Sequence, residues 1–482
     1  HMTSTLNIEP QNVWDWFSRI CAVPHGSGDT GALADLIVCF AKERGLACRR
    51  DTAGNVILRK PASRGYEDHP EVILQGHLDM VAVKDADFPG DPARDGVCPV
   101  CRDGWVFAPG TSLGGDDGIA VAMALAVLDS DTLPHPPLTV LLTNDEEIGM
   151  LGVTAADLSD IQARRLINID SEEEGVLTVS CAGGMTAVIT LPLARETRTG
   201  TALTLRLSHL TGGHSGVEIH KGGANADKLM AAILRQCLSG LDAGIAELSG
   251  GEKDNAIPTD AVVRLITDPA QIPAWQTLIR ALEAELRDRY KETDPYLTLD
   301  CAIGGAETAD TLTAASAAAL LNLTADTKNG VIAYSDFDPA LVRTSLNLGI
   351  LRTAPKQATL TWSVRSAVEQ EKAALAAHLT AMAEENGAVF SQSGTYSAWE
   401  YRQDSPLREL LAALWEEQTG HAPRVCGTHG GLECGPLCGM LPGLDAVSIG
   451  PDMEGIHTTA ERLNVASVGR IWTFLTAALA RL

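Results

Sequence analysis

Basic residues are scarce in this sequence. It contains 37 Lys and Arg residues against 62 Asp and Glu residues, so its net charge at pH 7 is −25. A chain with this excess of negative charge repels polyanions at long range. We therefore expect neither nucleic acid nor an anionic membrane surface as a partner.

Long apolar runs are also lacking. The longest apolar helical stretch, residues 118–128 (GIAVAMALAVL), is shorter than the roughly 20 residues needed to cross a bilayer. The N-terminal segment lacks the basic-then-apolar layout of a secretory signal. The 11 cysteines are odd in number and scattered, which suits reduced thiols. These absences predict a cytoplasmic protein without a membrane span.

Apolar residues in short periodic runs are plentiful, and they indicate the fold. The 482 residues are enough for two or three domains. Residues 11–23 and 30–46 have the apolar spacing of helices, whereas residues 71–76, 137–143 and 165–170 are short runs rich in Val, Ile and Leu. Strands that alternate with helices in this way predict an α/β domain with a mostly parallel sheet flanked by helices.

The middle of the chain has a different pattern. Alternating strands flank two long helical segments, around 225–238 and 272–290, which is typical of an α+β insert with an antiparallel sheet. The α/β pattern then returns and ends in an apolar-striped helix. We therefore predict a discontinuous α/β domain, residues 1–183 and 398–482, and an inserted domain, residues 184–397.

Histidine or acidic residues follow each of three predicted strands. His77 and Asp79 follow the first, Glu146 and Glu147 the second, and Asp170 the third. Ligands of such sheets collect beyond the carboxyl ends of the strands. A solvated turn is the plainer interpretation of one acidic run by itself, but three strands that end in this way favour a binding site. Glu146 and Glu147 are adjacent, so one can bind a metal while the other faces the substrate.

Two more ligand-type residues lie elsewhere. Asp116 and Asp117 occupy a glycine-rich turn before a helix, where glycine permits unusual dihedrals and the helix start favours carboxylates. An acidic helix cap is the alternative interpretation. His457 lies in a loop before the last helix. Histidines combined with carboxylates form a mixed nitrogen and oxygen ligand set, which suits zinc, manganese or cobalt and differs from a thiolate site. If two ions lie a few ångströms apart, one carboxylate must bridge them, and we predict that Asp116 is this bridging ligand.

A family resemblance rests on many motifs in a fixed order. From about residue 12 to the C-terminus the chain resembles aminoacyl-histidine dipeptidases. These are the Xaa-His dipeptidase (peptidase D) branch of the di-zinc exopeptidases, which also include carnosinases and aminoacylases. The motifs are LQGHLDMV, GTSLGGDDGIA, TNDEEIGMLG, INIDSEEEG, CAGGM, GGHSGVEIH, NAIP, SLNLG, HGGLECG and SIGP before a later His.

The resemblance implies the fold and the roles of the site residues. The fold would be a di-metal exopeptidase domain with an inserted lid. Glu146 would be the general base, and Asp79 would orient His77. Two divalent ions per chain are implied, as Zn²⁺ with Mn²⁺ or Co²⁺ as alternatives. The implied ligands are His77, Asp116 and Asp170 for one ion, and Asp116, Glu147 and His457 for the other.

The resemblance also implies that the insert is a lid that carries the contact of a homodimer. His214 would stabilise the oxyanion in the neighbouring subunit. Asn255 and Arg365 would hold the substrate carboxylate, which matches the fork of an arginine side chain. By the residues alone, a loop histidine is the plainer interpretation of His214, and a surface strand arginine is the alternative interpretation of Arg365. His429 and Glu433 are pocket residues without an assigned role.

The implied activity is hydrolysis of unblocked dipeptides, carnosine-like Xaa-His substrates among them, by a hydroxide held between the two ions. An amidohydrolase that cleaves N-acyl or modified amino acids is one alternative. A non-catalytic metal-binding regulatory protein is another, which the intact Glu146 disfavours. The turn departs from the family pattern, because Asp117 replaces an amide and Gly115 an alanine. These departures bear on metal preference and specificity.

Overall fold

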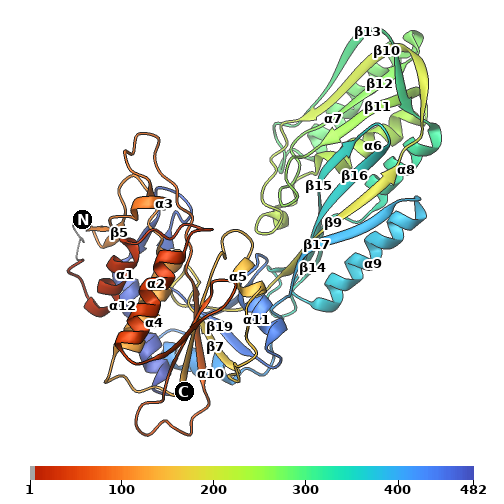
Figure 1. Ribbon diagram of the computed structural model, residues 1–482. Coiled ribbons are helices and arrows are strands. Elements are labelled where there is room, and N and C mark those ends of the chain that lie inside the picture. The colour runs from red at the N-terminus through yellow and green to blue at the C-terminus, as the bar shows by residue number, and fades with distance from the viewer. Residues whose placement is uncertain (1–5) are drawn as a thin grey trace. The chain divides into compact units, whose positions relative to one another are not determined.

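The computed structural model describes residues 6–482. Contacts within the chain divide it into two compact units, each with a large sheet of its own (Figure 1). The first unit runs to Ser180 and resumes over Tyr401–Gly427 and Leu432–Leu482. The second unit consists of Cys181–Glu400 and Thr428–Gly431. No sequence pattern had indicated that the short segment at 428–431 groups with the second unit.

The sheet of the first unit is parallel at its centre. Its strands are β1 (Ala47–Arg50), β2 (Val56–Lys60), β3 (Val72–His77), β6 (Leu138–Thr143), β7 (Arg165–Asn168), β8 (Val176–Cys181), β18 (Arg424–Thr428) and β19 (Asp445–Ser448). Their order is β1-β2-β6-β3-β7-β19-β8-β18. The neighbours β6, β3, β7 and β19 pair in parallel, whereas β1, β2 and β8 pair antiparallel. β3 and β6 are buried along their whole length, which explains their unbroken apolar sequences.

The first unit also contains helices. They are α1 (Gln11–Cys21), α2 (Gly31–Glu43), α3 (Pro92–Asp95), α4 (Gly115–Asp129), α5 (Leu151–Thr154), α10 (Pro406–Thr419), α11 (Cys434–Met440) and α12 (Val465–Leu479). Of these helices, α2, α4, α10 and α11 contact strands of this sheet. α4 lies between β3 and α1 and is buried from its first residue to Leu128, which matches its apolar sequence on every face.

A small four-stranded sheet completes the first unit. It has the order β20-β21-β5-β4 and comprises β4 (Val100–Arg102), β5 (Trp105–Phe107), β20 (Met453–Glu454) and β21 (Arg462–Asn464). β21 leads directly into α12, the terminal helix.

The second unit is built on an antiparallel sheet (Figure 1). Its strands are β9 (Gly183–Pro192), β10 (Arg195–Ser208), β11 (Ala243–Gly250), β12 (Ala261–Thr267), β13 (Thr298–Leu312), β14 (Gly330–Tyr334), β15 (Val342–Thr353), β16 (Gln357–Ser366) and β17 (Val389–Tyr396). Its helices include the expected α6 (Ala226–Leu238) and α7 (Ile272–Arg289), together with α8 (Ala314–Asp326) and α9 (Glu369–Glu385), which were not expected. Side chains from the sheet and these helices form one apolar core.

The predicted fold class is confirmed: a mostly parallel α/β sheet with helices is accompanied by a separate antiparallel α+β part. Within the described residues, every helix is too short or too polar to cross a bilayer.

Candidate metal centre

Three neighbouring parallel strands end at one edge of the first unit's sheet. β3 lies between β6 and β7, and its last residue, His77, is in register with Thr143 at the end of β6. Glu146 and Glu147 follow β6, and Asp170 follows β7. Because the strands are parallel neighbours, the side chains after them converge at the edge where ligands of such sheets bind.

A glycine turn brings Asp116 to the same edge. Gly114 has φ 74°, a left-handed conformation that favours glycine, and a Cβ there would lie 2.7 Å from Sδ of Met80. Asp116 and Asp117 have non-helical dihedrals although α4 begins beside them. Oδ2 of Asp117 accepts a hydrogen bond of 3.1 Å from the backbone N–H of His77, so the turn is tied to the end of β3.

The carboxylate of Asp116 lies between two histidines. Nε2 of His77 is 2.9 Å from Oδ1 of Asp116 and 3.7 Å from Oδ1 of Asp170. Nε2 of His457 is 3.1 Å from Oδ2 of Asp116 and 2.9 Å from Oε1 of Glu147. Two groups of three ligand atoms therefore share Asp116, and within each group the atoms lie within 4.8 Å of one another.

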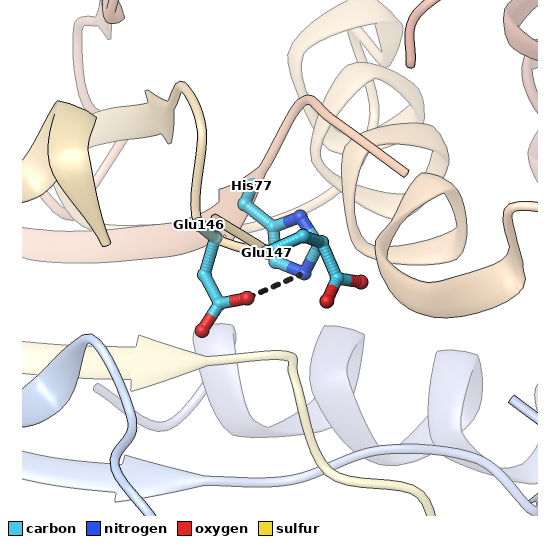
Figure 2. Close-up of side chains that lie close together, drawn as sticks. All are labelled: His77, Glu146 and Glu147. Atoms are coloured by element: carbon cyan, nitrogen blue, oxygen red, sulfur yellow. Dashed lines mark ion pairs between the residues drawn. The ribbon is translucent and has the colours of Figure 1, made fainter. Parts of the chain in front are cut away.

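Glu146 lies beside these two groups and forms a third candidate group of ligand atoms with His77 and Glu147. Its Oε2 is 4.0 Å from Nε2 of His77, and its carboxylate and that of Glu147 lie on different sides of the imidazole ring (Figure 2). The third acid of the run is directed elsewhere, because Asp145 has φ 52° and its Oδ1 accepts a hydrogen bond of 2.7 Å from the N–H of Gly28. Of the three consecutive acids, Asp145 therefore makes a turn contact, whereas Glu146 and Glu147 lie at the site.

Asp79 supports the site through its backbone and its side chain. The ring Nδ1 of His77 donates to the backbone oxygen of Asp79 at 2.9 Å and lies 3.4 Å from the carboxylate. The buried carboxylate accepts hydrogen bonds from the N–H groups of Glu146 (2.9 Å) and Glu147 (3.2 Å), and from the hydroxyl of Ser27 (2.8 Å). The carbonyl leaves Nε2 of His77 facing the carboxylates. The side chain shapes the acidic turn, a contact that the sequence did not indicate.

Glu146 and Asp170 hold their protons more tightly than ordinary carboxyl groups do. Burial raises the pKa of Glu146 to about 9 and that of Asp170 to about 7, and nearby acids add to both increases. Hydrogen bonds to Asp116 and Glu147 raise the pKa of His457 to about 10. Burial by itself raises the pKa of Asp116, but hydrogen bonds with His457 and His77 lower it below its usual value. This concentration of negative charge requires protons or cations for neutralisation.

The cluster fits a pair of divalent ions. Each of the two groups that share Asp116 combines imidazole nitrogen with carboxylate oxygen, which is the donor set that zinc, manganese and cobalt accept. His77 is 1 % exposed, whereas the side chain of His457 is 44 % exposed. One group is therefore enclosed and the other reaches the surface of the unit.

A second set of predicted residues lies in the second unit. Nδ1 of His214 accepts hydrogen bonds from the backbone N–H groups of Gly216 (3.1 Å) and Val217 (3.3 Å). A Cβ at Gly216 would be 2.9 Å from Cε1 of His214 and 3.3 Å from Cζ of Arg365, so this histidine and this arginine are neighbours. Burial and the charge of Arg365 lower the pKa of His214. With Nδ1 accepting, the proton of the neutral ring resides on Nε2.

Two further residues lie near this pair. Asn255 and His214 line a cavity of about 820 Å³. Nε2 of His429 lies 2.7 Å from Oγ of Ser345, and burial together with the charge of Arg365 lowers the pKa of His429 to about 3. His429 is therefore buried and neutral, and it is close enough to Arg365 to be affected by its charge. The sequence motif around His429 did not indicate this proximity.

Two acids of the first unit had no role predicted from the sequence. Glu433 is buried, and its Oε2 accepts hydrogen bonds of 2.6 Å from Gln75 and from Thr143 beneath the strand ends. Glu461 contacts the backbone of the turn that carries Asp116. Its position four residues after His457 is a signal that could have drawn attention to it.

Comparison with known proteins identifies the family. The profile of peptidase family M20/M25/M40 matches residues 73–481. The chain belongs to this family. A relative in Escherichia coli (strain K12), named cytosol non-specific dipeptidase, is 37 % identical over 482 residues, which are 99 % of each chain.

Two solved structures match the chain over nearly its whole length. The crystal structure of aminoacylhistidine dipeptidase from Vibrio alginolyticus matches with a TM-score of 0.91 and 33 % identity, over 99 % of this chain and 97 % of the other. The structure of aminopeptidase PepT from Bacillus cereus has a TM-score of 0.56 at 16 % identity and covers 98 % of each chain, which shows the common fold. The predicted resemblance is confirmed, and so is the predicted enzyme class, a metallopeptidase of the dipeptidase type.

Proposed function

We propose that this M20 peptidase hydrolyses the peptide bond of unblocked dipeptides and that carnosine-like Xaa-His dipeptides are among its substrates. The observation that carries the proposal is the carboxylate of Asp116, which turns one oxygen toward each of two histidines. The names of the relatives from Escherichia coli and Vibrio alginolyticus support it. The first of these names also supports a cytoplasmic location.

Two divalent ions would occupy the two groups that share Asp116. We assign Zn²⁺ to them, with Mn²⁺ or Co²⁺ as alternatives, since all three accept mixed nitrogen and oxygen ligands. When bound, the ions supply Lewis acidity, which lowers the pKa of water from 15.7 to about 7 and polarises the scissile carbonyl. The proposed ligands are His77, Asp116 and Asp170 on one side, and Asp116, Glu147 and His457 on the other.

Glu146 is our candidate for the general base. Its Oε2 lies 4.0 Å from Nε2 of His77, and its backbone N–H donates a hydrogen bond to the carboxylate of Asp79. Burial raises the pKa of this carboxyl in the ion-free site, and two bound cations would favour the ionised carboxylate that a general base requires. Oε2 of Glu146 would accept the proton of the attacking water and return it to the departing amine.

Residues of the second unit would bind the substrate and its oxyanion. We assign residues 184–397 to a lid and dimerisation domain, and residues 1–183 and 398–482 to the catalytic domain. His214 carries its ring proton on Nε2 when Nδ1 accepts backbone hydrogen bonds, so Nε2 can donate to an oxyanion. The guanidinium of Arg365 beside it, together with Asn255, would hold the substrate carboxylate. In a homodimer these groups would serve the partner subunit's metal site.

A substrate panel tests the proposal. The metal-free protein is reconstituted with Zn²⁺, Mn²⁺ or Co²⁺ and assayed against Xaa-His dipeptides, other unblocked dipeptides and N-acyl amino acids. We expect metal-dependent cleavage of the unblocked dipeptides. Preferential cleavage of the N-acyl compounds would instead establish an amidohydrolase, and metal binding without any turnover would establish a regulatory protein.

A further inference from the structure

The carboxylate of Glu461 is held by the backbone of the turn that carries Asp116. Its Oε2 accepts hydrogen bonds from the N–H groups of Leu113 (2.7 Å) and Gly114 (3.1 Å). Its Oε1 accepts hydrogen bonds from the N–H groups of Gly115 (2.8 Å) and Asp116 (3.3 Å). Glu461 is only 3 % exposed. Four consecutive backbone donors therefore converge on one buried carboxylate.

The segment that supplies Glu461 also supplies His457. Glu461 follows His457 by four residues and precedes β21, which is paired on one side with β20 and on the other with β5. A Cβ at Gly115 would lie 3.0 Å from Cγ of Leu463 and 3.3 Å from Oε1 of Glu461, so the segment packs closely on the turn. One short stretch of chain thus carries one histidine of the site and holds the backbone of the shared carboxylate.

The turn depends on such outside support. Gly114 and Gly115 leave the backbone many conformations, and Asp116 itself is non-helical, so the hydrogen bonds of α4 do not determine its orientation. A carboxylate that accepts several backbone N–H groups makes strong, charge-assisted hydrogen bonds. The orientation of the Asp116 carboxylate is consequently coupled to the position of Glu461.

We propose that Glu461 is a positioning residue of the metal centre. By holding residues 113–116 against the segment that carries His457, it directs one oxygen of Asp116 toward His77 and the other toward His457. The inference rests on the proposed function, since it gives Glu461 a role only if Asp116 is shared by two ions. Outer partners of metal ligands typically change metal affinity or activity by about 10–100-fold when mutated.

A purely structural helix cap is the competing explanation. Loss of such a cap lowers the melting temperature but leaves ion affinity and turnover of the folded protein unchanged. Loss of a positioning residue weakens ion binding in protein that is still folded. Ion affinity therefore separates the two roles, and it does so without any measurement of activity.

The test compares Glu461→Gln with Glu454→Gln. The amide introduced by the first substitution would direct N–H donors at the N–H donors of the turn. Glu454 lies in the same hairpin but is paired with the exposed Arg462, so the control loses the same charge without touching the turn. Zn²⁺ is titrated calorimetrically into the metal-free forms, and kcat and KM are measured at saturating Zn²⁺. We expect about 10–100-fold weaker binding of at least one ion and a lower kcat with little change in KM for Glu461→Gln, and parental values for the control.

Each outcome decides the inference. Parental ion affinity in a folded Glu461→Gln variant would overturn it, even if the melting temperature had fallen. If Glu461→Gln does not fold, Glu461→Asp replaces it: the shorter side chain keeps the charge but cannot reach all four N–H groups, and unchanged ion affinity would again overturn the proposal. A parent protein that binds no ions would instead defeat the proposed function, and the positioning role with it.

Discussion

Oδ2 of Asp116 lies 3.1 Å from Nε2 of His457, although 341 residues separate the two in the sequence. The opposite oxygen of the same carboxylate faces His77 at 2.9 Å. A ligand that bridges two ions needs one oxygen directed toward each of them, and the Asp116 carboxylate has this arrangement between the two histidines. The centre is thereby assembled from the beginning and the end of the first unit.

The purified protein should carry close to two divalent ions per chain. The two groups that share Asp116 offer three ligand atoms each. The pKa of Asp170 is raised in the absence of cations, so this carboxyl should release its proton when an ion binds. Elemental analysis measures the content, and dialysis against a chelator should abolish peptidase activity. Full activity after exhaustive removal of metal would contradict the assignment.

Substitution of the adjacent glutamates should separate chemistry from ion binding. Glu146→Gln should retain both ions and lower kcat by about 10²–10⁴-fold, the usual contribution of general acid–base catalysis. Glu147→Gln should weaken one ion, because Oε1 of Glu147 lies 2.9 Å from Nε2 of His457. Ion titrations and kcat are measured on both variants. A nearly parental Glu146→Gln variant would exclude Glu146 as the base.

The metal-free protein should lose stability as the pH rises from about 6.5 to about 9. His457, with its pKa raised to about 10, stabilises the fold below 6.5 and loses this contribution as the pH rises. Glu146, with its pKa raised to about 9, is ionised in the unfolded chain but protonated in the folded one. The folded state thus binds more protons, so the free energy of unfolding falls with pH.

Melting temperatures at several pH values test this expectation. The decrease should be smaller with bound ions, which neutralise the carboxylates, and smaller in metal-free Glu146→Gln, which cannot ionise at that position. A melting temperature of the metal-free parent that rose between pH 6.5 and 9 would contradict the assigned pKa shifts.

His214→Ala should lower kcat by about 10²–10³-fold, the usual effect of removing one oxyanion donor. Ion content should stay at the parental value, because His214 belongs to the second unit and the metal ligands to the first. kcat is measured by steady-state kinetics, and ion content by elemental analysis, on the same preparation. Unchanged turnover would exclude the oxyanion role.

Subunit mixing tests whether His214 acts across a dimer. A heterodimer of His214→Ala and Glu146→Gln chains has one site with Glu146 from its own chain and His214 from the partner. Statistical exchange should therefore restore up to about a quarter of parental activity from two nearly inactive proteins. Confirmed exchange without restored activity, or a fully active monomer, would contradict the trans arrangement.

The neighbouring arginine provides a matched control for that experiment. Arg365 lies beside His214 in the same chain, so both should serve the same site. Mixing His214→Ala with Arg365→Ala should then restore nothing, while Arg365→Ala mixed with Glu146→Gln should. Restoration in the first mixture would show that the two residues serve different subunits.

Local patterns were sufficient to predict much of the fold. β3 and β6 are buried on both faces, so their sequences are continuous apolar runs, and the apolar periodicity of α6 and α7 reflects one buried face. α8 and α9 escaped prediction because alanine-rich or mixed sequences give them little contrast between their faces. The grouping of 428–431 with the second unit depends on contacts with distant strands, which no local pattern records.

The sequence by itself determined which residues could form the centre. His77, the acids after β6 and β7, and the glycine turn at Asp116 are local features, because strand ends and tight turns need particular residues at particular positions. Only the tertiary structure decided how these residues are used. The contacts of the two Asp116 oxygens with His77 and His457 join segments that are distant in the sequence. The same is true of the backbone hydrogen bonds that the carboxylates of Asp79 and Glu461 accept. Hydrogen-bond geometry of this kind arises from packing, and sequence spacing does not encode it.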